Sequence, residues 1–449
     1  MSKQRIQLSD HFTYSRLLRF VLPCIGTMLF TSIYGIVDGL CVSNFVGKTA
    51  FAAVNLIMPL PMLLGTIGFM LGTGGSAIVG ITLGEGDQKK ADRYFTLFLL
   101  AALVSVSVLA VLGIVFLRPI AVLLGAKGEL LDYAVRYGRI LMMSLPTFAL
   151  QNMFQSFFVT AEKPHLGFWF TVGAGCTNMV LDVLMVGIWG WGVEGAAIAT
   201  FISQLVGGVL PVFYFIDRSN TSRLHLCQTK VYGGVLRDAC INGSSELMTN
   251  LSMSLVNILY NFQLLRLAGE NGVAAYGVIM YAAFLFVAVF VGYAVGSAPI
   301  VSFHYGARNH AEVHNLYRKS LRLIAVVAVT LTLASMFIIP CVARVFVGYD
   351  AELLALTSRA FRLYALSFLI MGFNVYASSF FTALGDGVTS ALISFLRTLA
   401  FQVIAILLLP MLLGIDGIWL AVTAAELAAL AVSAAMLLTK DKVFHYRKA

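Results

Sequence analysis

The stretch that decides the fold is YFTLFLLAALVSVSVLAVLGIVFL, residues 94–117, in which 24 consecutive residues carry no charged side chain. At about 1.5 Å of rise per residue, a helix of about 20 residues crosses the roughly 30 Å hydrocarbon core of a bilayer. Backbone groups in lipid must be hydrogen-bonded within the chain, so only helices and closed barrels can cross it. Barrel strands are about 10 residues long and alternate in polarity. This run therefore predicts a membrane-spanning helix.

The composition extends this prediction to the whole chain of 449 residues. Apolar residues make up 59% and charged residues 11% of the sequence, against roughly 25% charged residues in an average soluble domain, which excludes a water-soluble protein. We predict an all-α integral membrane protein with twelve transmembrane helices and no separate soluble domain. The predicted spans are residues 17–44, 50–82, 94–117, 136–160, 165–188, 192–216, 238–265, 273–303, 320–341, 358–383, 388–413 and 417–438.

Basic residues concentrate on one predicted side of the membrane. The formal net charge is +9, and most of the 30 Lys and Arg fall in the inner segments when both termini are placed inside. A positive-inside bias of this kind fixes orientation, so we expect a multi-pass membrane protein with both termini cytoplasmic. The same bias explains the positive charge without a nucleic-acid partner.

The two halves of the sequence match at an offset of 222 residues. Gly74–Val79 (GGSAIV) falls on Gly296–Val301 (GSAPIV), and the turn Gly192–Gly195 (GVEG) falls on Gly414–Gly417 (GIDG). An even number of spans per repeat makes both halves cross in the same direction, related by an axis along the membrane normal. We predict two six-helix bundles in a parallel pseudo-two-fold repeat: an N-lobe (1–216), a cytoplasmic linker (217–237) and a C-lobe (238–449).

Two acidic residues, Asp38 and Asp182, lie inside predicted spans. A carboxylate in hydrocarbon is costly unless it is protonated, paired or facing water, so an intramembrane acid is a candidate functional residue. Each acid lies about six residues, or about 9 Å of helix rise, from the outer end of its span. Asn178 shares a helix face with Asp182, and Thr200 lies at a similar depth. The repeat provides no acidic counterpart for the pair, which therefore belongs to the N-lobe alone.

Several short motifs occur in a specific order: Asp38-Gly39 followed by FVG, GTGGSA closing the second span, the GEGDQKKA loop, NMVLD in the fifth span and GVEGAAIAT opening the sixth. In this order they resemble the MATE (multidrug and toxic compound extrusion) family, in the branch that includes DinF-like and MepA-like bacterial exporters. The resemblance implies a transporter, not an enzyme, that exports cationic or amphipathic drugs by alternating access. It implies H+ or Na+ as the coupling ion and no cofactor. It further implies a protein of the bacterial plasma (inner) membrane, and we expect a monomer.

The resemblance also implies roles for the residues around the acids. Family members with an N-lobe coupling site place acids where Asp38 and Asp182 stand, and polar partners where this chain has Tyr137, Asn152, Asn178 and Thr200. Gln155 occupies a position often held by Asn. By our count Asn152 lies deeper than the acids. Pro23 matches the proline at which the first helix is proposed to bend. No structural metal site is expected, but the oxygens of Asp38, Asp182 and Asn178 suit Na+ as well as a proton.

Two further intramembrane charges are candidates for a second site. Glu246 in the seventh span has no counterpart in the repeat, and sodium-using family members often carry acids near it. They usually have another acid in the tenth span, where this chain has Asn374. Arg397 lies ten residues into the eleventh span and either forms a structural pair, extends to the interface or contacts substrate.

The sequence leaves one alternative function open, a lipid-linked oligosaccharide or lipid flippase of the same superfamily. Such substrates carry phosphates and call for cations from several spans, whereas Arg397 is the one clear intramembrane cation. A membrane-embedded enzyme would need a catalytic cluster near an interface. Signatures such as G-x-S-x-G and H-E-x-x-H are missing from the sequence.

Overall fold

The structure, a computed structural model, describes residues 6–46, 48–348 and 350–447, none of which lies in a strand. The helices of the first half are α1 (Tyr14–Phe45), α2 (Lys48–Ile57), α3 (Pro59–Gly84), α4 (Gln88–Leu123), α5 (Gly128–Thr160), α6 (Pro164–Asp182), η1 (Val183–Ile188), α7 (Gly192–Gly208) and α8 (Leu210–Ile216). Those of the second half are α9 (Gly233–Gly306), α10 (His310–Val347), α11 (Ala351–Ala365), α12 (Phe368–Ala383), α13 (Gly387–Phe395), η2 (Leu396–Ala400), α14 (Phe401–Leu413), α15 (Ile415–Thr439) and α16 (Asp441–Phe444).

These helices have the length and polarity of membrane spans. Within the described ranges, nine are long and apolar enough to cross a membrane, and α11 with α12, bent by 46°, makes a tenth. The 74-residue α9 is broken at Gly269, whose φ of 60° lies in the left-handed region that favours glycine, so it holds two rods. The 33-residue α5 also has the length of a span. The all-helical membrane architecture is confirmed, and the count of twelve stays a prediction.

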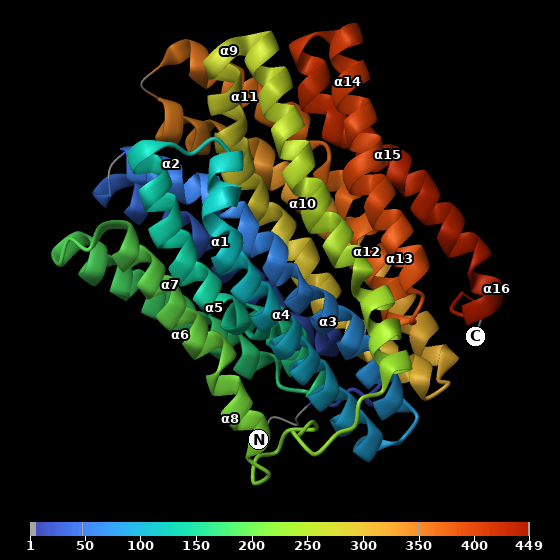
Figure 1. The fold of residues 1–449 in the computed structure, drawn as a ribbon. Coiled ribbons are helices and arrows are strands. Elements are labelled where there is room, and N and C mark those ends of the chain that lie inside the picture. The colour runs from blue at the N-terminus through green and yellow to red at the C-terminus, as the bar shows by residue number, and fades with distance from the viewer. Residues whose placement is uncertain (1–5, 47, 349, 448–449) are drawn as a thin grey trace.

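The chain forms two groups of helices, shown in blue to green and in yellow to red in Figure 1. In the first group α1 packs on α6, and α5 packs on α4 and α7; in the second, α9 packs on α12 and α13, and α14 on α15. The two groups meet most extensively along α3 and α9. This arrangement agrees with the predicted two-lobe repeat.

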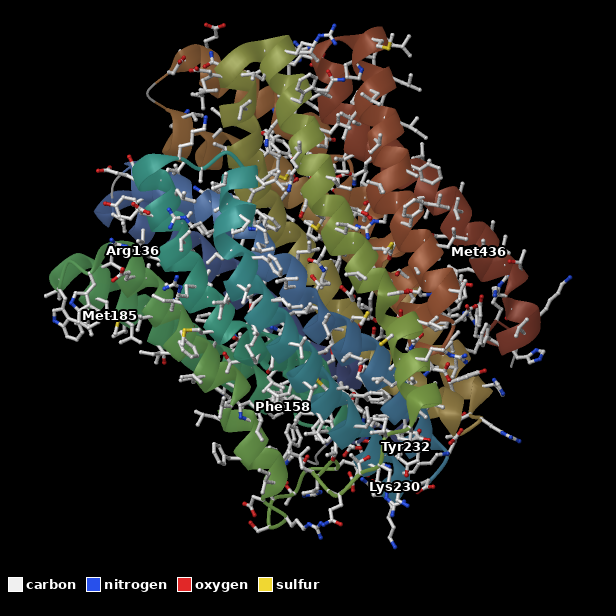
Figure 2. The ribbon with its side chains drawn as sticks, in the orientation of Figure 1. Arg136, Phe158, Met185, Lys230, Tyr232 and Met436 are labelled. Atoms are coloured by element: carbon white, nitrogen blue, oxygen red, sulfur yellow. The ribbon has the colours of Figure 1, made fainter. Side chains whose placement is uncertain are left out.

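An extended segment, residues 217–232, joins the lobes and lies against α4. The Thr229 hydroxyl donates to the Arg93 carbonyl at 2.9 Å, and the ring of Tyr232 packs edge-on against Tyr94. Figure 2 shows Lys230 and Tyr232 at the lower end of the bundle in that view. The predicted domain limits at 216 and 238 stay predictions, although α8 ends at Ile216 and α9 begins at Gly233.

Glycines allow the lobes to touch through their backbones. A Cβ atom added to Gly84 of α3 would meet the carbonyl oxygen of Phe303, and one added to Gly306 of α9 would meet the carbonyl oxygen of Ile81. Backbone atoms cannot give way as flexible side chains do, so neither glycine can carry a side chain in this arrangement. The contact lies where α3 ends and α9 ends, and it closes the bundle there.

The same end, called here the terminal end, is tied by a segment that precedes α1. This strap, residues 6–13, connects the two lobes. The Leu8 amide donates to Glu162 Oε1 at 2.9 Å, and the Phe12 amide donates to Glu312 Oε1 at 2.8 Å. Leu8 and Phe12 are completely buried. Arg223 of the extended segment pairs with Glu162 at 2.7 Å, which completes the seal.

An ion pair between Asp386 and Lys440 also lies at the terminal end. The Lys440 Nζ is 2.9 Å from Asp386 Oδ2, and Asp386 caps α13 by accepting hydrogen bonds from the amide and hydroxyl of Thr389. Burial raises the pKa of Asp386, but the Lys440 ammonium and the Thr389 hydrogen bonds outweigh it, so the pKa lies below its usual value. The pair stabilises the start of α13 when Asp386 is ionised.

The helices differ from the predicted spans at local breaks. The span predicted at 50–82 is divided into α2 and α3, because Pro59 and Pro61 lack an N–H and fit only the first turn of a new helix. A π-helical turn, η1, ends the span predicted at 165–188, and a second one, η2, interrupts the span predicted at 388–413. Turns of this kind are rare and are often found at functional sites.

Candidate functional site

The two intramembrane acids of the N-lobe lie next to each other. Asp38 is on α1, and Asp182 is the last residue of α6, directly before η1. Their carboxyl groups face each other closely enough to share a hydrogen bond. Asp182 is completely buried, and neither of its oxygens accepts a hydrogen bond from a donor group of the described residues. Two carboxylates have no donor between them, so the pair needs a proton or a cation.

Two tyrosines, Tyr137 and Tyr34, lie near this acid pair. Tyr137 of α5 is buried and lies within electrostatic reach of both carboxyl groups, and its hydroxyl contacts Met58 Sδ at 3.9 Å. Tyr34 lies one turn before Asp38 on α1, also within its electrostatic reach. Tyr34 is not among the site residues predicted from the sequence, although the spacing of four residues places it on the same helix face as Asp38.

Asn178 and Thr200 extend the polar cluster toward α7. The Asn178 side chain donates to Thr200 Oγ1 at 3.5 Å, and the Thr200 hydroxyl donates to the Ala196 carbonyl at 3.0 Å. The Asn178 Oδ1 is buried and accepts no hydrogen bond from the part of the chain that is described. Together with the acids, it leaves a set of unpartnered oxygens. Such oxygens suit a proton carrier or a hard cation such as Na+.

Three residues carried over from the family resemblance lie away from the acids. Asn152 follows Tyr137 by fifteen residues on α5, or about 22 Å of helix rise. Gln155 lines a small cavity with Cys24 and other residues of α1, α5, α6 and α9. Pro23 lies inside α1, where its carbonyl oxygen accepts a hydrogen bond from the Thr27 hydroxyl at 2.9 Å.

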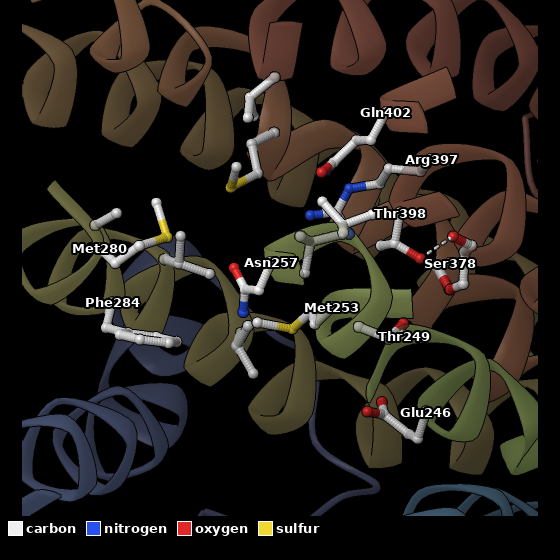
Figure 3. A pocket seen from close by; sticks show the side chains of 18 of the residues that line it. Glu246, Thr249, Met253, Asn257, Met280, Phe284, Ser378, Arg397, Thr398 and Gln402 are labelled. Carbon is white, nitrogen blue, oxygen red and sulfur yellow. Dashed lines mark hydrogen bonds between the residues drawn. The ribbon is translucent and has the colours of Figure 1, made fainter. Parts of the chain in front are cut away.

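A cavity of about 790 Å³ opens mainly into the C-lobe. Its lining on α9 begins at Ser245 and continues on both sides of the Gly269 break as far as Ala298. It therefore extends from the middle of the bundle toward the end opposite the strap. Figure 3 shows Arg397 and Gln402 on one side of the open centre and Glu246 on another. The remaining lining is rich in methionine and aromatic side chains.

A buried ion-pair network supports one wall of the cavity. Arg397, carried by η2, donates from Nε to Glu426 Oε1 at 2.7 Å, and Glu426 is completely buried. The Asn374 side chain donates to Glu426 Oε2 at 2.8 Å and accepts from the Ser433 hydroxyl at 2.9 Å. Arg397 therefore forms a structural pair, one of its predicted alternatives, and it also lines the cavity.

Glu426 is a candidate functional residue that was not predicted from the sequence. The signal was present, because Glu426 is an acid within the predicted span 417–438, and the rule that identified Asp38 and Asp182 applies to it equally.

The chain resembles known membrane transporters in sequence and in fold. The sequence model of the MatE family matches residues 23–184 and 247–408, one segment in each half. The chain is 20% identical over 434 residues to the multidrug export protein MepA of Staphylococcus saprophyticus, and 22% identical over 433 residues to MepA of Staphylococcus aureus MSSA476; each match covers 96% of this chain and 95% of the relative. Two solved structures share its fold with a TM-score of 0.92 and 22% identity over the full length of both chains: a multidrug resistance MATE family transporter in its outward-facing conformation, and MATE in complex with MaL6.

Proposed function

Because the chain belongs to the MatE family, we propose that it is a multidrug efflux antiporter, which exports cationic or amphipathic drugs in exchange for H+ or Na+. The observation that carries the proposal is the pair of adjacent acids: Asp182 is completely buried and Asp38 partly buried, and no described donor group bonds the Asp182 oxygens or Asp38 Oδ1. The curated relatives, multidrug export proteins that match nearly the whole chain, support drugs as substrates. The large cavity, which opens mainly into the C-lobe, supports the same class of substrate.

The proposed cycle uses the acids as a switch between the two ends of the bundle. With the terminal end sealed by the strap and by Gly84 and Gly306, the cavity faces the opposite, outer side. A proton or Na+ entering from that side cancels one of the two negative charges and so relieves the repulsion between the adjacent carboxylates. The drug leaves, and the N-lobe then closes on the outer side. The ion is released after the terminal end opens. Each ligand need only bind one state better than the other.

The remaining residues have supporting roles in this proposal. Tyr137, Asn178 and Thr200 position the acids and complete the oxygen set for Na+. Asn152 and Gln155 lie deeper in the N-lobe, on the path toward the terminal end. Pro23 is the point at which α1 bends, because the carbonyl four residues before a proline loses its helix hydrogen bond.

The charge distribution supports the proposed orientation of the chain in the membrane. The protein lies in the bacterial plasma membrane as a monomer of twelve spans, with both termini and the linker cytoplasmic, in accordance with the positive-inside rule. It has no enzymatic activity and no nucleic-acid partner. Glu246 serves the C-lobe cavity as a substrate-binding or second ion-binding acid.

A transport assay in liposomes tests the proposal. Purified protein is reconstituted, and ethidium movement is followed under a pH gradient and, separately, under a Na+ gradient. We expect uphill movement with one of the two gradients, and none for Asp38→Asn. The matched control is Asp238→Asn, which changes an exposed acid outside the cavity. Equal ethidium movement with and without both gradients would refute ion-coupled antiport.

The flippase alternative is distinguished by the charges of the cavity. Arg397 is the one Lys, Arg or His among the described residues that line it, whereas a pyrophosphate-linked substrate calls for several cations. Scrambling of a fluorescent lipid-linked oligosaccharide in the same liposomes, without ethidium transport, would favour the flippase.

A further inference from the structure

The guanidinium of Arg397 makes a hydrogen bond to the protein through only one of its three nitrogen atoms, as far as the described residues show. Its Nε atom donates a hydrogen bond to Glu426. No described residue accepts a hydrogen bond from either Nη atom, and neither Nη atom is fully buried. The side chain is 12% exposed, and Figure 3 shows it reaching from η2 into the cavity. The Nη edge therefore faces the open space.

The ion pair with Glu426 does not account for this orientation. Both oxygens of Glu426 are occupied, one by Arg397 and the other by Asn374, so the buried acid is fully compensated. A lysine would supply the same charge. What arginine adds is a planar fork of N–H groups, whose geometry matches a carboxylate with two parallel hydrogen bonds.

The other walls of the cavity favour a ligand with an apolar body and a second charge. Met253, Met280 and Phe284 line the cavity, and Figure 3 shows Met280 and Phe284 across the open centre from Arg397; methionine adapts to ligands of varied shape. Glu246 also lines it, and no donor on the described residues bonds its carboxylate. Arg397 lies within electrostatic reach of Glu246, so one ligand can meet both charges.

We propose that Arg397 determines substrate specificity by binding the carboxylate of an amphipathic substrate through its two Nη groups, while a basic group of the same substrate faces Glu246. This rests on the proposed efflux function and names a preference within it. The cavity discriminates between a molecule that carries a carboxylate and the same molecule with that group esterified. A permanent cation without a carboxylate binds independently of the Arg397 fork.

Binding by the purified full chain tests the proposal, with three probes: norfloxacin, which has a carboxylate and an amine; norfloxacin methyl ester, which keeps only the amine; and ethidium. The first variant is Arg397→Lys, which retains the charge beside Glu426 but removes the fork. The second is the double variant Arg397→Gln with Glu426→Gln, which leaves no unpaired buried charge. Arg359→Gln, at an exposed ion pair with Asp416, is the control.

We expect both test variants to lose about tenfold or more in norfloxacin affinity, the effect of a charge-assisted hydrogen bond, and to bind the ester and ethidium as the wild type does. The control should bind all three unchanged. Unchanged norfloxacin binding by both test variants, or an equal loss for all three probes, would overturn the proposal and leave Arg397 a structural residue. If the wild type binds none of the probes, the efflux function itself is refuted, so the two failures are distinguishable.

Discussion

Replacing Asp182 with asparagine tests the coupling site most sharply. The Asp182 side chain is fully buried, and no described donor group bonds its oxygens. A buried charge without a partner costs about 3–5 kcal/mol, and each 1.4 kcal/mol is about a factor of ten in population. Binding of one proton or one Na+ therefore shifts the equilibrium between the outward-open and closed N-lobe by about 100-fold to 4,000-fold. The variant lacks this shift.

The assay is ethidium accumulation in liposomes under an imposed pH or Na+ gradient. The Asp182→Asn variant should accumulate ethidium only to the passive level with either gradient, while Asp238→Asn matches the wild type. Uphill accumulation by Asp182→Asn at a tenth of the wild-type rate or more would refute the reasoning, because the expected loss is at least about 100-fold.

Thermal unfolding in detergent separates lost coupling from lost folding. The asparagine has the same shape, and its amide can donate to Asp38, which now lacks a like-charged neighbour. The variant should therefore unfold at the wild-type temperature or above it. A melting temperature lower by several degrees would indicate that Asp182 holds the fold together and is not a coupling residue.

Three further changes test the packing and charge arguments. Glu426→Gln leaves Arg397 without its buried partner and should destabilise the protein by about 3–5 kcal/mol in thermal unfolding, most of which the double glutamine variant restores. Gly306→Ala places a Cβ against a backbone carbonyl of α3, so it should part the lobes at the terminal end, seen as faster labelling of a cysteine introduced there. Asp386→Asn keeps a capping oxygen but loses the ion pair with Lys440 and the negative charge at the start of α13, so it should cost about 1 kcal/mol at pH 7. Because the folded pKa of Asp386 is lowered, that stabilisation is present above the unfolded pKa and is lost as the pH falls below about 4, so the melting temperatures of Asp386→Asn and the wild type should then converge.

The helical membrane fold followed from the sequence because its cause is local. A run such as residues 94–117 can satisfy its backbone groups in lipid only as a helix. The neighbourhood of Asp38 and Asp182 could also be predicted, since both acids lie at similar depth from the ends of their spans. Depth along a helix follows from counting residues at a fixed rise.

Details that depend on packing between helices could not be predicted. The π-helical turn η2 carries Arg397 into the cavity, and no sequence pattern marks its place. The break between α11 and α12 contains no proline, so it could not be predicted from the sequence either. Glu426 differs from these, because its signal was present and its partner Arg397 had already been identified.

The strap sets a length limit on any motion at the terminal end. Only four residue steps separate the amide of Leu8, held by Glu162, from the amide of Phe12, held by Glu312. A fully extended chain covers about 3.5 Å per residue, so these amides can move at most about 14 Å apart. While both bonds hold, the segment acts as a tether of fixed reach between Glu162 and Glu312. A wider separation of these two glutamates has to release one anchor first.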